Sequence, residues 1–105
     1  MKIIVETDNH ITGTEKLREE FTTKVEGTFR KFETHITTIQ VNLSDENASK
    51  SGPNDKKCSL EVRLKGEQPV VVTEYAGTLR DSLQGALKKG SRTVKNTIEK
   101  KQTHR

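Results

Sequence analysis

The stretch CSLEVRLKGEQPVVVT, residues 58–73, contains the pattern on which the predicted fold depends. Apolar and polar residues alternate from Cys58 to Lys65, as in a strand that buries one face and exposes the other. Gly66 and Glu67 predict a short turn, and residues 68–73, with three consecutive valines, predict the returning strand. The stretch therefore predicts a β-hairpin whose apolar face carries Cys58, Leu60, Val62 and Leu64.

Two further strands are predicted upstream of this hairpin. Residues 37–43 alternate in the same manner, and residues 2–7 combine β-branched side chains with a turn signal at Asp8-Asn9. The polar segment from Asp45 to Lys57 contains Gly-Pro and Asn-Asp pairs, which predict a long hairpin loop. Four strands are thus expected, and no helix is predicted between the last three.

Residues 14 to about 32 predict the first of two helices. Their apolar residues recur at spacings of four, four, four and three, which forms one stripe along a helix. Thr14 is a suitable N-cap, and Glu15 complements the helix dipole. The stripe includes all three phenylalanines of the chain, so we expect it to pack in the core: Leu17, Phe21, Val25, Phe29 and Phe32.

The second predicted helix starts near Ala76 and runs to roughly Lys100. Its apolar residues cover an arc of roughly 120°, and four basic residues fall in an arc on the opposite side. The apolar positions are Leu79, Leu83, Ala86, Leu87, Val94 and Ile98, and the basic positions are Lys88, Lys89, Arg92 and Lys95. Gly90 falls on the apolar side, where it would permit close packing on the sheet, whereas the sequence gives no reason for Gly85. Residues 102–105 are predicted to form a frayed tail.

The predicted order is β-α-β-β-β-α, in a single domain that comprises residues 1–101. An α+β two-layer sandwich satisfies the strand alternation and the helix stripes, with both helices on one face of a four-stranded sheet. The first two strands would be parallel and joined by a right-handed crossover through the first helix, and the rest would be an antiparallel meander. This arrangement is similar to that of double-stranded-RNA-binding domains.

Positive charge is concentrated towards the C-terminal end of the chain. Residues 80–105 contain eight Lys or Arg and two acidic residues, a net +6, while the remaining residues, with eleven and thirteen, carry a net −2. This asymmetry favours a surface for a polyanion, although a solvated basic helix face gives the same charge pattern. Because there is no Trp and only one Tyr, Tyr75, the composition favours recognition of folded or duplex RNA over stacking on single-stranded bases.

Residues with catalytic or metal-binding chemistry are scattered along the chain. His10, His35 and His104 have no metal-ligand spacing. Cys58 is the only cysteine, so no internal disulfide is possible, and its inward position predicts a small hydrophobe rather than a nucleophile. We therefore expect no enzymatic activity, no cofactor, no metal and no small-molecule substrate. The sequence has no run of about 18 apolar residues and no signal peptide, which predicts no membrane partner and a cytoplasmic location.

Two segments resemble a known family. Residues 14–25, TEKLREEFTTKV, are similar to the first helix of the ribosome hibernation-promoting factors, also called ribosome-associated inhibitors or sigma-54 modulation proteins. That helix typically reads Thr-x-x-Leu-Arg-x-Tyr-x-x-x-Lys. Residues 74–81, EYAGTLRD, resemble the family's acidic-x-Tyr-Ala-Ala-Ile-Asp opening of the second helix, and a basic helix follows in both. Since the sequence ends after this helix, the resemblance is to the short form of the family.

The resemblance implies a ribosome-binding function without bond chemistry. Such domains occupy the channel of the small ribosomal subunit that messenger RNA and tRNA use, so that translation stops and the idle ribosome is protected during stress. It implies that this chain binds the small subunit and its rRNA, and we expect a monomer. By position, the implied rRNA-binding residues are Arg18, Lys24, Lys88, Lys89, Arg92 and Lys95, with Lys31 as a further candidate.

Other hypotheses remain open at the level of sequence. Five glutamates between residues 15 and 33 balance the five basic residues of the first helix, so that this helix is neutral. A protein-interaction module that has kept the fold but lost ribosome binding would also fit. An enzyme that depends on a metal or on Cys58 is a third hypothesis, which thiol titration of the native protein would test.

Overall fold

Four strands form one mixed sheet in the computed structural model, which describes residues 1–9, 11, 14–46 and 55–103. The sheet order is β1-β2-β3-β4, with β1 parallel to β2 and the other neighbours antiparallel. The strands are β1 (Lys2–Thr7), β2 (Ile36–Asp45), β3 (Lys56–Leu64) and β4 (Val70–Ala76). The predicted hairpin is confirmed, because Leu60 pairs with Val72 and Val62 with Val70. Gly66 turns the chain between them with a positive φ of 72°.

β1 has the predicted bounds, whereas the other three strands are longer than the sequence predicted. β2 and β3 stay paired up to Asp45 and Lys56, whose side chains approach to 3.5 Å, and these two residues were assigned to a loop. β4 starts after Pro69, which has no N–H to donate to a ladder, and continues three residues past Thr73. Residues 47–54 of the predicted loop lie outside the described residues, as do His10 and His104.

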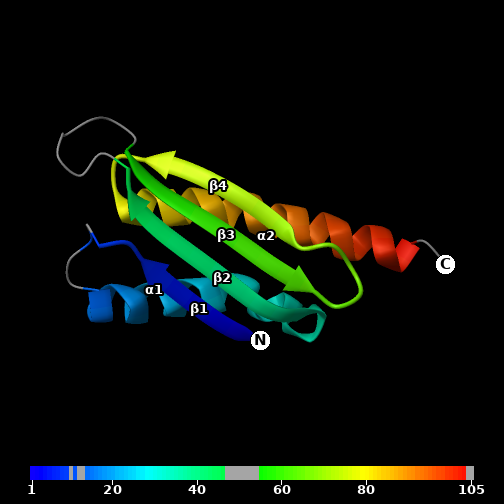
Figure 1. The fold of residues 1–105 in the computed structure, drawn as a ribbon. Coiled ribbons are helices and arrows are strands. Elements are labelled where there is room, and N and C mark those ends of the chain that lie inside the picture. Colours follow the sequence, from blue (N-terminus) through cyan, green and yellow to red (C-terminus); the bar gives the residue numbers. More distant parts are fainter. Residues whose placement is uncertain (10, 12–13, 47–54, 104–105) are drawn as a thin grey trace.

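Both helices cover the same face of the sheet, as Figure 1 shows. They are α1 (Thr14–Phe29) and α2 (Leu79–Thr103), and the α+β sandwich predicted from the sequence is confirmed. α1 packs against β1, α2 packs against β3 and β4, and the two helices contact each other. No helix within the described ranges is long and apolar enough to cross a bilayer.

α1 ends at Phe29, three residues earlier than predicted, and a 3₁₀ helix, η1 (Arg30–His35), follows it. The backbone N–H of Lys65 donates to the carbonyl of His35 at 2.9 Å, which ties the end of η1 to the turn after β3. Phe32 still packs against the core, because residues three apart eclipse in a 3₁₀ helix and Phe32 lies three after Phe29. The apolar stripe is therefore confirmed, and the α-helix is confirmed up to Phe29, whereas residues 30–32 were wrongly predicted to continue it.

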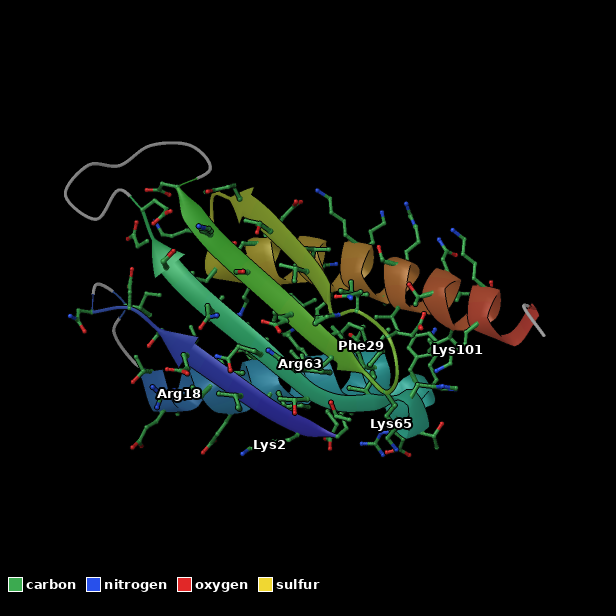
Figure 2. All side chains as sticks on the ribbon, turned by 45° about the vertical axis from the view of Figure 1, so that its right-hand side comes forward. Lys2, Arg18, Phe29, Arg63, Lys65 and Lys101 are labelled. Atoms are coloured by element: carbon green, nitrogen blue, oxygen red, sulfur yellow. The ribbon has the colours of Figure 1, made fainter. Side chains whose placement is uncertain are left out.

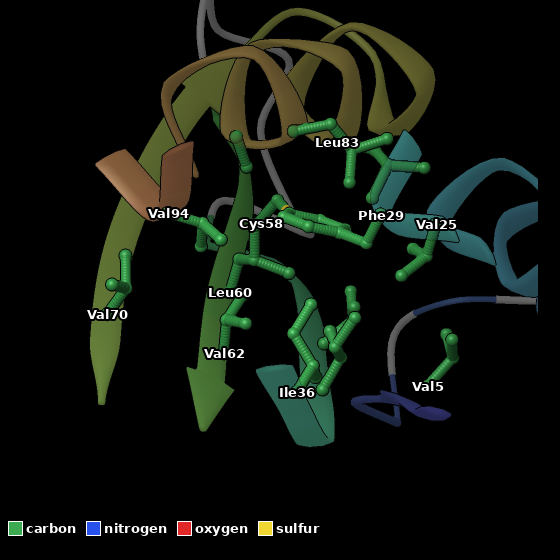
Figure 3. Packing of buried hydrophobic residues seen from close by; sticks show 14 of the residues in the cluster. Val5, Val25, Phe29, Ile36, Cys58, Leu60, Val62, Val70, Leu83 and Val94 are labelled. Carbon is green, nitrogen blue, oxygen red and sulfur yellow. The ribbon is translucent and has the colours of Figure 1, made fainter. Parts of the chain in front are cut away.

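The core lies between the helices and the sheet (Figure 3). Its buried side chains come from the predicted positions: Phe21, Val25 and Phe29 of α1, Leu83, Ala86, Leu87, Val94 and Ile98 of α2, and the inner rows of β2 and β3. Leu17, Phe32 and Leu79 lie half-buried at its margin. Cys58 is fully buried, and burial, with a smaller contribution from the Glu74 carboxylate, raises the pKa of its thiol to about 12.

α2 begins at Leu79 because Thr78 caps it: the Asp81 N–H donates to the Thr78 hydroxyl at 3.0 Å. The segment before it, expected to be helical from Ala76, completes β4 instead. The helix continues through Thr103, so that residues 102 and 103 of the predicted tail are helical, and residues 104–105 are outside the described part. Gly90 faces the sheet as expected, since a Cβ there would lie 2.6 Å from Cδ2 of Leu60.

Candidate nucleic-acid interface

The outward side of α2 carries the four predicted basic residues, which we call the basic stripe: Lys88, Lys89, Arg92 and Lys95. All four side chains are exposed, while the apolar side of the same helix is buried against the sheet. Figure 2 shows nitrogen-tipped side chains that project from this helix into solvent. The amphipathic placement predicted from the helical period is therefore confirmed, and a role in binding rRNA stays a prediction.

The members of the stripe differ in their ionic surroundings. The Lys89 ammonium donates to a carboxylate oxygen of Glu74 on β4 at 2.6 Å. Lys88, Arg92 and Lys95 form no ion pair with any described residue. They are separated by four and three residues, so they make a continuous row along one side of the helix. None of these three charges is held in an ion pair by a described residue, and the acidic Glu99 lines the same hollow as Lys95.

A furrow runs between the first and second helices, and we call it the interhelical furrow. One of its hollows, about 520 Å³, is lined by Thr23, Lys24, Gly27 and Thr28 of α1 and by Arg80, Asp81, Leu83, Gln84 and Leu87 of α2. A second hollow, about 280 Å³, is lined by Lys31, Phe32 and His35 of η1 and by Lys95, Ile98 and Glu99 of α2. Lys24 and Lys31 thus border the furrow on one side, and Lys95 borders it on the other.

Lys31 also contacts an aromatic ring within this furrow. Its ammonium nitrogen lies 5.3 Å from the centroid of the Phe32 ring, within the range of a cation–π contact. The contact leaves the lysine exposed, because the ring lies half-buried beneath it. Lys31, the weakest of the sequence predictions, is therefore placed as well as any of the others.

Arg18 does not join this cluster. Six residues at about 100° each place it about 120° around α1 from Lys24. It lines none of the described hollows, and Figure 2 shows it beside the β1 edge of the molecule. The fold therefore brings Lys31 and Lys95 to one hollow of the furrow and Lys24 to the other, and Arg92 and Lys88 continue the row of cations along α2. It leaves Arg18 apart and pairs Lys89 with Glu74.

An ion pair that the sequence did not predict closes one end of the furrow. The guanidinium of Arg80 donates to both oxygens of Glu20 at 2.6 and 2.7 Å. This hydrogen bond is the largest cause that lowers the pKa of Glu20 and raises that of Arg80. The two residues are 60 positions apart, and no pattern in the sequence links them.

Metal-binding geometry is absent from the part of the chain that the structure describes, where no three His, Cys, Asp or Glu side chains converge. The Asp45 carboxylate lies 3.5 Å from the Lys56 ammonium, and the backbone N–H of Asp45 donates to the Asp8 carboxylate. The exposed Lys and Arg side chains of the helical layer are the candidate binding groups. They can bind phosphate groups of a polyanion.

A family model and solved structures match this chain. The family model described as sigma 54 modulation protein / S30EA ribosomal protein matches residues 4–102. The crystal structure of the Protein Y N-terminal domain of Thermus thermophilus is similar, with a TM-score of 0.72, 20% identity, and coverage of 92% of this chain and 99% of that one. A ribosomal subunit interface protein from Coxiella burnetii has a TM-score of 0.75, 14% identity, and coverage of 94% and 99%.

At such identities the two structures establish the fold alone. No curated protein sequence matches this chain. The family model, in contrast, spans nearly every residue from β1 to α2, which is far more than half of the sequence. The chain therefore belongs to the sigma 54 modulation protein / S30EA ribosomal protein family.

Proposed function

We propose that this protein associates with the ribosome, binds the rRNA backbone of the small subunit, and inhibits translation by occupying the channel for messenger RNA and tRNA. Membership of a family described as ribosomal supports the association. The observation that carries the finer proposal is a row of three exposed cations on α2 with no ion-pair partner among the described residues, Lys88, Arg92 and Lys95, whose last member shares a hollow of the interhelical furrow with Lys31.

The chemistry of this surface suits phosphate groups more than bases. Lysine ammonium groups and the fork of Arg92 bind phosphate oxygens without reading sequence. Stacking on bases needs exposed aromatic rings, and Phe21 and Phe29 are buried. Phe32 is half-buried and in contact with Lys31, and Tyr75 lies on the opposite, outer face of the sheet. Recognition by shape and backbone is the mode that remains for this helical layer.

The shape of the molecule supports inhibition by occupancy. The chain is elongated, 52 × 24 × 18 Å, and α2, at about 37 Å, accounts for much of its length. A rigid body of this form can fill a channel in a larger assembly, and no catalytic step is required. Its cations along one long side would hold it against the anionic wall.

The test is sedimentation with purified small subunits, combined with a cell-free translation assay. The variant Lys88→Glu, Arg92→Glu, Lys95→Glu should remain at the top of the gradient and leave translation uninhibited. The matched control is Lys2→Glu, Arg63→Glu, Lys65→Glu, which changes the charge equally at three exposed residues away from the basic stripe. The control should sediment with the subunits as the wild type does.

Two outcomes would contradict the proposal. If both triple variants lose binding equally, general charge attraction explains the association. If the wild type sediments alone and a pull-down recovers one protein without rRNA, the chain is a protein-interaction module that retains the family's fold. The exposed Val71 and Tyr75, at 61% and 50% exposure on the outer face of the sheet, would then be the first surface to mutate.

A further inference from the structure

We propose that Glu74 withholds Lys89 from RNA, so that the phosphate-binding row of α2 consists of Lys88, Arg92 and Lys95. On this view Gly85 is a glycine because the Glu74 side chain lies where a Cβ would be. The inference rests on the proposed function and refines it. It assigns Glu74 as a residue that limits the RNA-binding surface to the furrow side of α2.

The ion pair itself is the first observation. The Lys89 ammonium is 2.6 Å from the Glu74 carboxylate, a short charge-assisted hydrogen bond, and the two side chains are 60% and 26% exposed. Lys88 precedes Lys89 directly, is also exposed, and has no ionic partner among the residues described. The two adjacent lysines lie about 100° apart around the helix, and only Lys89, on the side towards β4, has a carboxylate beside it.

The position of Glu74 in the sheet is the second observation. It occupies the helix-facing row of β4 together with Val70, Val72 and Ala76, which are apolar. Its partner across the ladder is the buried Cys58, whose thiol pKa it helps to raise. A carboxylate next to a core of this kind needs a cation, because a charge that is partly removed from water is costly without a partner. Lys89 supplies that cation.

Gly85 is the third and independent observation. A Cβ on this residue would lie 2.5, 2.7 and 2.9 Å from Oε2, Cγ and Cδ of Glu74, so the acidic side chain lies flat against the helix. Glycine within a helix costs about 1 kcal/mol relative to alanine. At Gly27 an added Cβ would meet nothing within 4 Å and at Gly90 it would meet the apolar Leu60, so Gly85 is the described helix glycine that a charged side chain crowds. Gly85, which the sequence left unexplained, thus makes room for the carboxylate.

The consequence for a polyanion follows from the charges. A phosphate that binds Lys89 has to displace the Glu74 carboxylate or approach it, and either event offsets the attraction of the lysine. The β4 side of α2 is therefore locally neutral, while Lys88, Arg92 and Lys95 keep their full charge. RNA should lie over the outward and furrow sides of the helix and avoid the β4 side.

Lys88→Met and Lys89→Met form a matched pair of variants for the test, since each removes one charge from adjacent exposed positions. Their affinity for purified small subunits and for a duplex rRNA fragment would be measured between about 50 and 200 mM salt. Lys88→Met should weaken binding by about threefold or more and reduce the log–log salt slope by about 0.7 to 0.9. Lys89→Met should change the affinity by less than about twofold and leave the slope unaltered.

Releasing Lys89 from its ion pair with Glu74 should strengthen RNA binding. Glu74→Gln keeps the shape of the side chain and should strengthen binding by about threefold, with a steeper slope. Gly85→Ala should do the same by pushing the carboxylate away. In the Glu74→Gln background, Lys89→Met should now weaken binding as Lys88→Met does. Circular dichroism of each variant establishes that the fold is retained.

The outcomes separate the two proposals. Equal losses for Lys88→Met and Lys89→Met in the otherwise wild-type chain, or weaker binding by Glu74→Gln, would overturn the role of Glu74 while leaving RNA binding intact. A wild type that binds neither the subunit nor the RNA fragment would overturn the proposed function, and with it this refinement.

Discussion

Gly90 and Gly27 belong to different helices and meet opposite surroundings. Gly90 is buried where α2 packs on the sheet, and the nearest atom to an added Cβ is Cδ2 of the buried Leu60 at 2.6 Å. Gly27 is exposed and open beside the interhelical furrow. The same substitution therefore tests tight packing at one residue and helix propensity at the other.

Gly90→Ala should destabilise the protein by about 1 to 2 kcal/mol, because overpacking costs about 1 to 3 kcal/mol and the gain in helix propensity offsets part of it. Gly27→Ala should stabilise it by about 0.5 to 1 kcal/mol, since only the propensity changes. Urea unfolding followed by circular dichroism measures both. A stabilising Gly90→Ala would show that α2 can move away from Leu60 at little cost.

Between elements, α1 and α2 are joined by the Glu20–Arg80 ion pair at one end of the furrow. A tie of this kind fixes the separation of the two helices and hence the distance between Lys24 and the α2 row. The bidentate geometry gives it a direction that a lysine at position 80 would not provide.

The Glu20–Arg80 pair should add a pH-dependent component to stability. Its hydrogen bond to Arg80 lowers the pKa of Glu20 below the ordinary value of 4.5. A depressed carboxyl pKa stabilises the fold above about pH 4.5, and this contribution is lost as the pH falls below it through the folded-state value. Melting temperatures at decreasing pH should therefore drop less in Glu20→Gln than in the wild type. The difference should be small because both groups are exposed, and identical profiles would mean that the pair does not form in solution.

Across the whole molecule, the cations on the outer face of the sheet and those of the α2 row differ in their ion pairing. On the outer face of the sheet, Arg63 pairs with Glu61 at 3.0 Å and Lys57 approaches Glu46 at 3.7 Å. On the helical layer, Lys88, Arg92 and Lys95 have no such partners among the described residues. The helical layer has ion pairs as well, among them Glu26–Arg30 and Glu20–Arg80, so the part of it expected to meet a polyanion is the row of cations on α2.

Ribosome binding should consequently depend strongly on salt. If five cations, namely Lys24, Lys31, Lys88, Arg92 and Lys95, each neutralise one phosphate, the slope of log affinity against log salt should be about −3.5 to −4.5. Sedimentation at a series of KCl concentrations measures it. A slope near zero would indicate that apolar contacts hold the complex and that the basic surface is incidental.

The periodicities of the sequence were sufficient for the fold class, the core and the amphipathic character of α2. Alternation in residues 58–65 and the stripe of Leu83, Leu87, Val94 and Ile98 report which side of an element is buried, because that information repeats every two or 3.6 residues along the chain. The seven basic candidates could be proposed in the same way, from local pattern and a family resemblance.

Element ends and charge partners depended on contacts between segments that are distant in sequence. α1 gives way to η1 after Phe29, η1 ends where the Lys65 N–H donates to the carbonyl of His35, and the furrow exists only because two helices share one face of the sheet. Glu74 meets Lys89, and Glu20 meets Arg80, across 15 and 60 positions. A periodic pattern does not reveal contacts between residues so far apart in sequence, because these contacts form only where the folded chain brings the groups together. These contacts determined which of the predicted cations have an ion-pair partner.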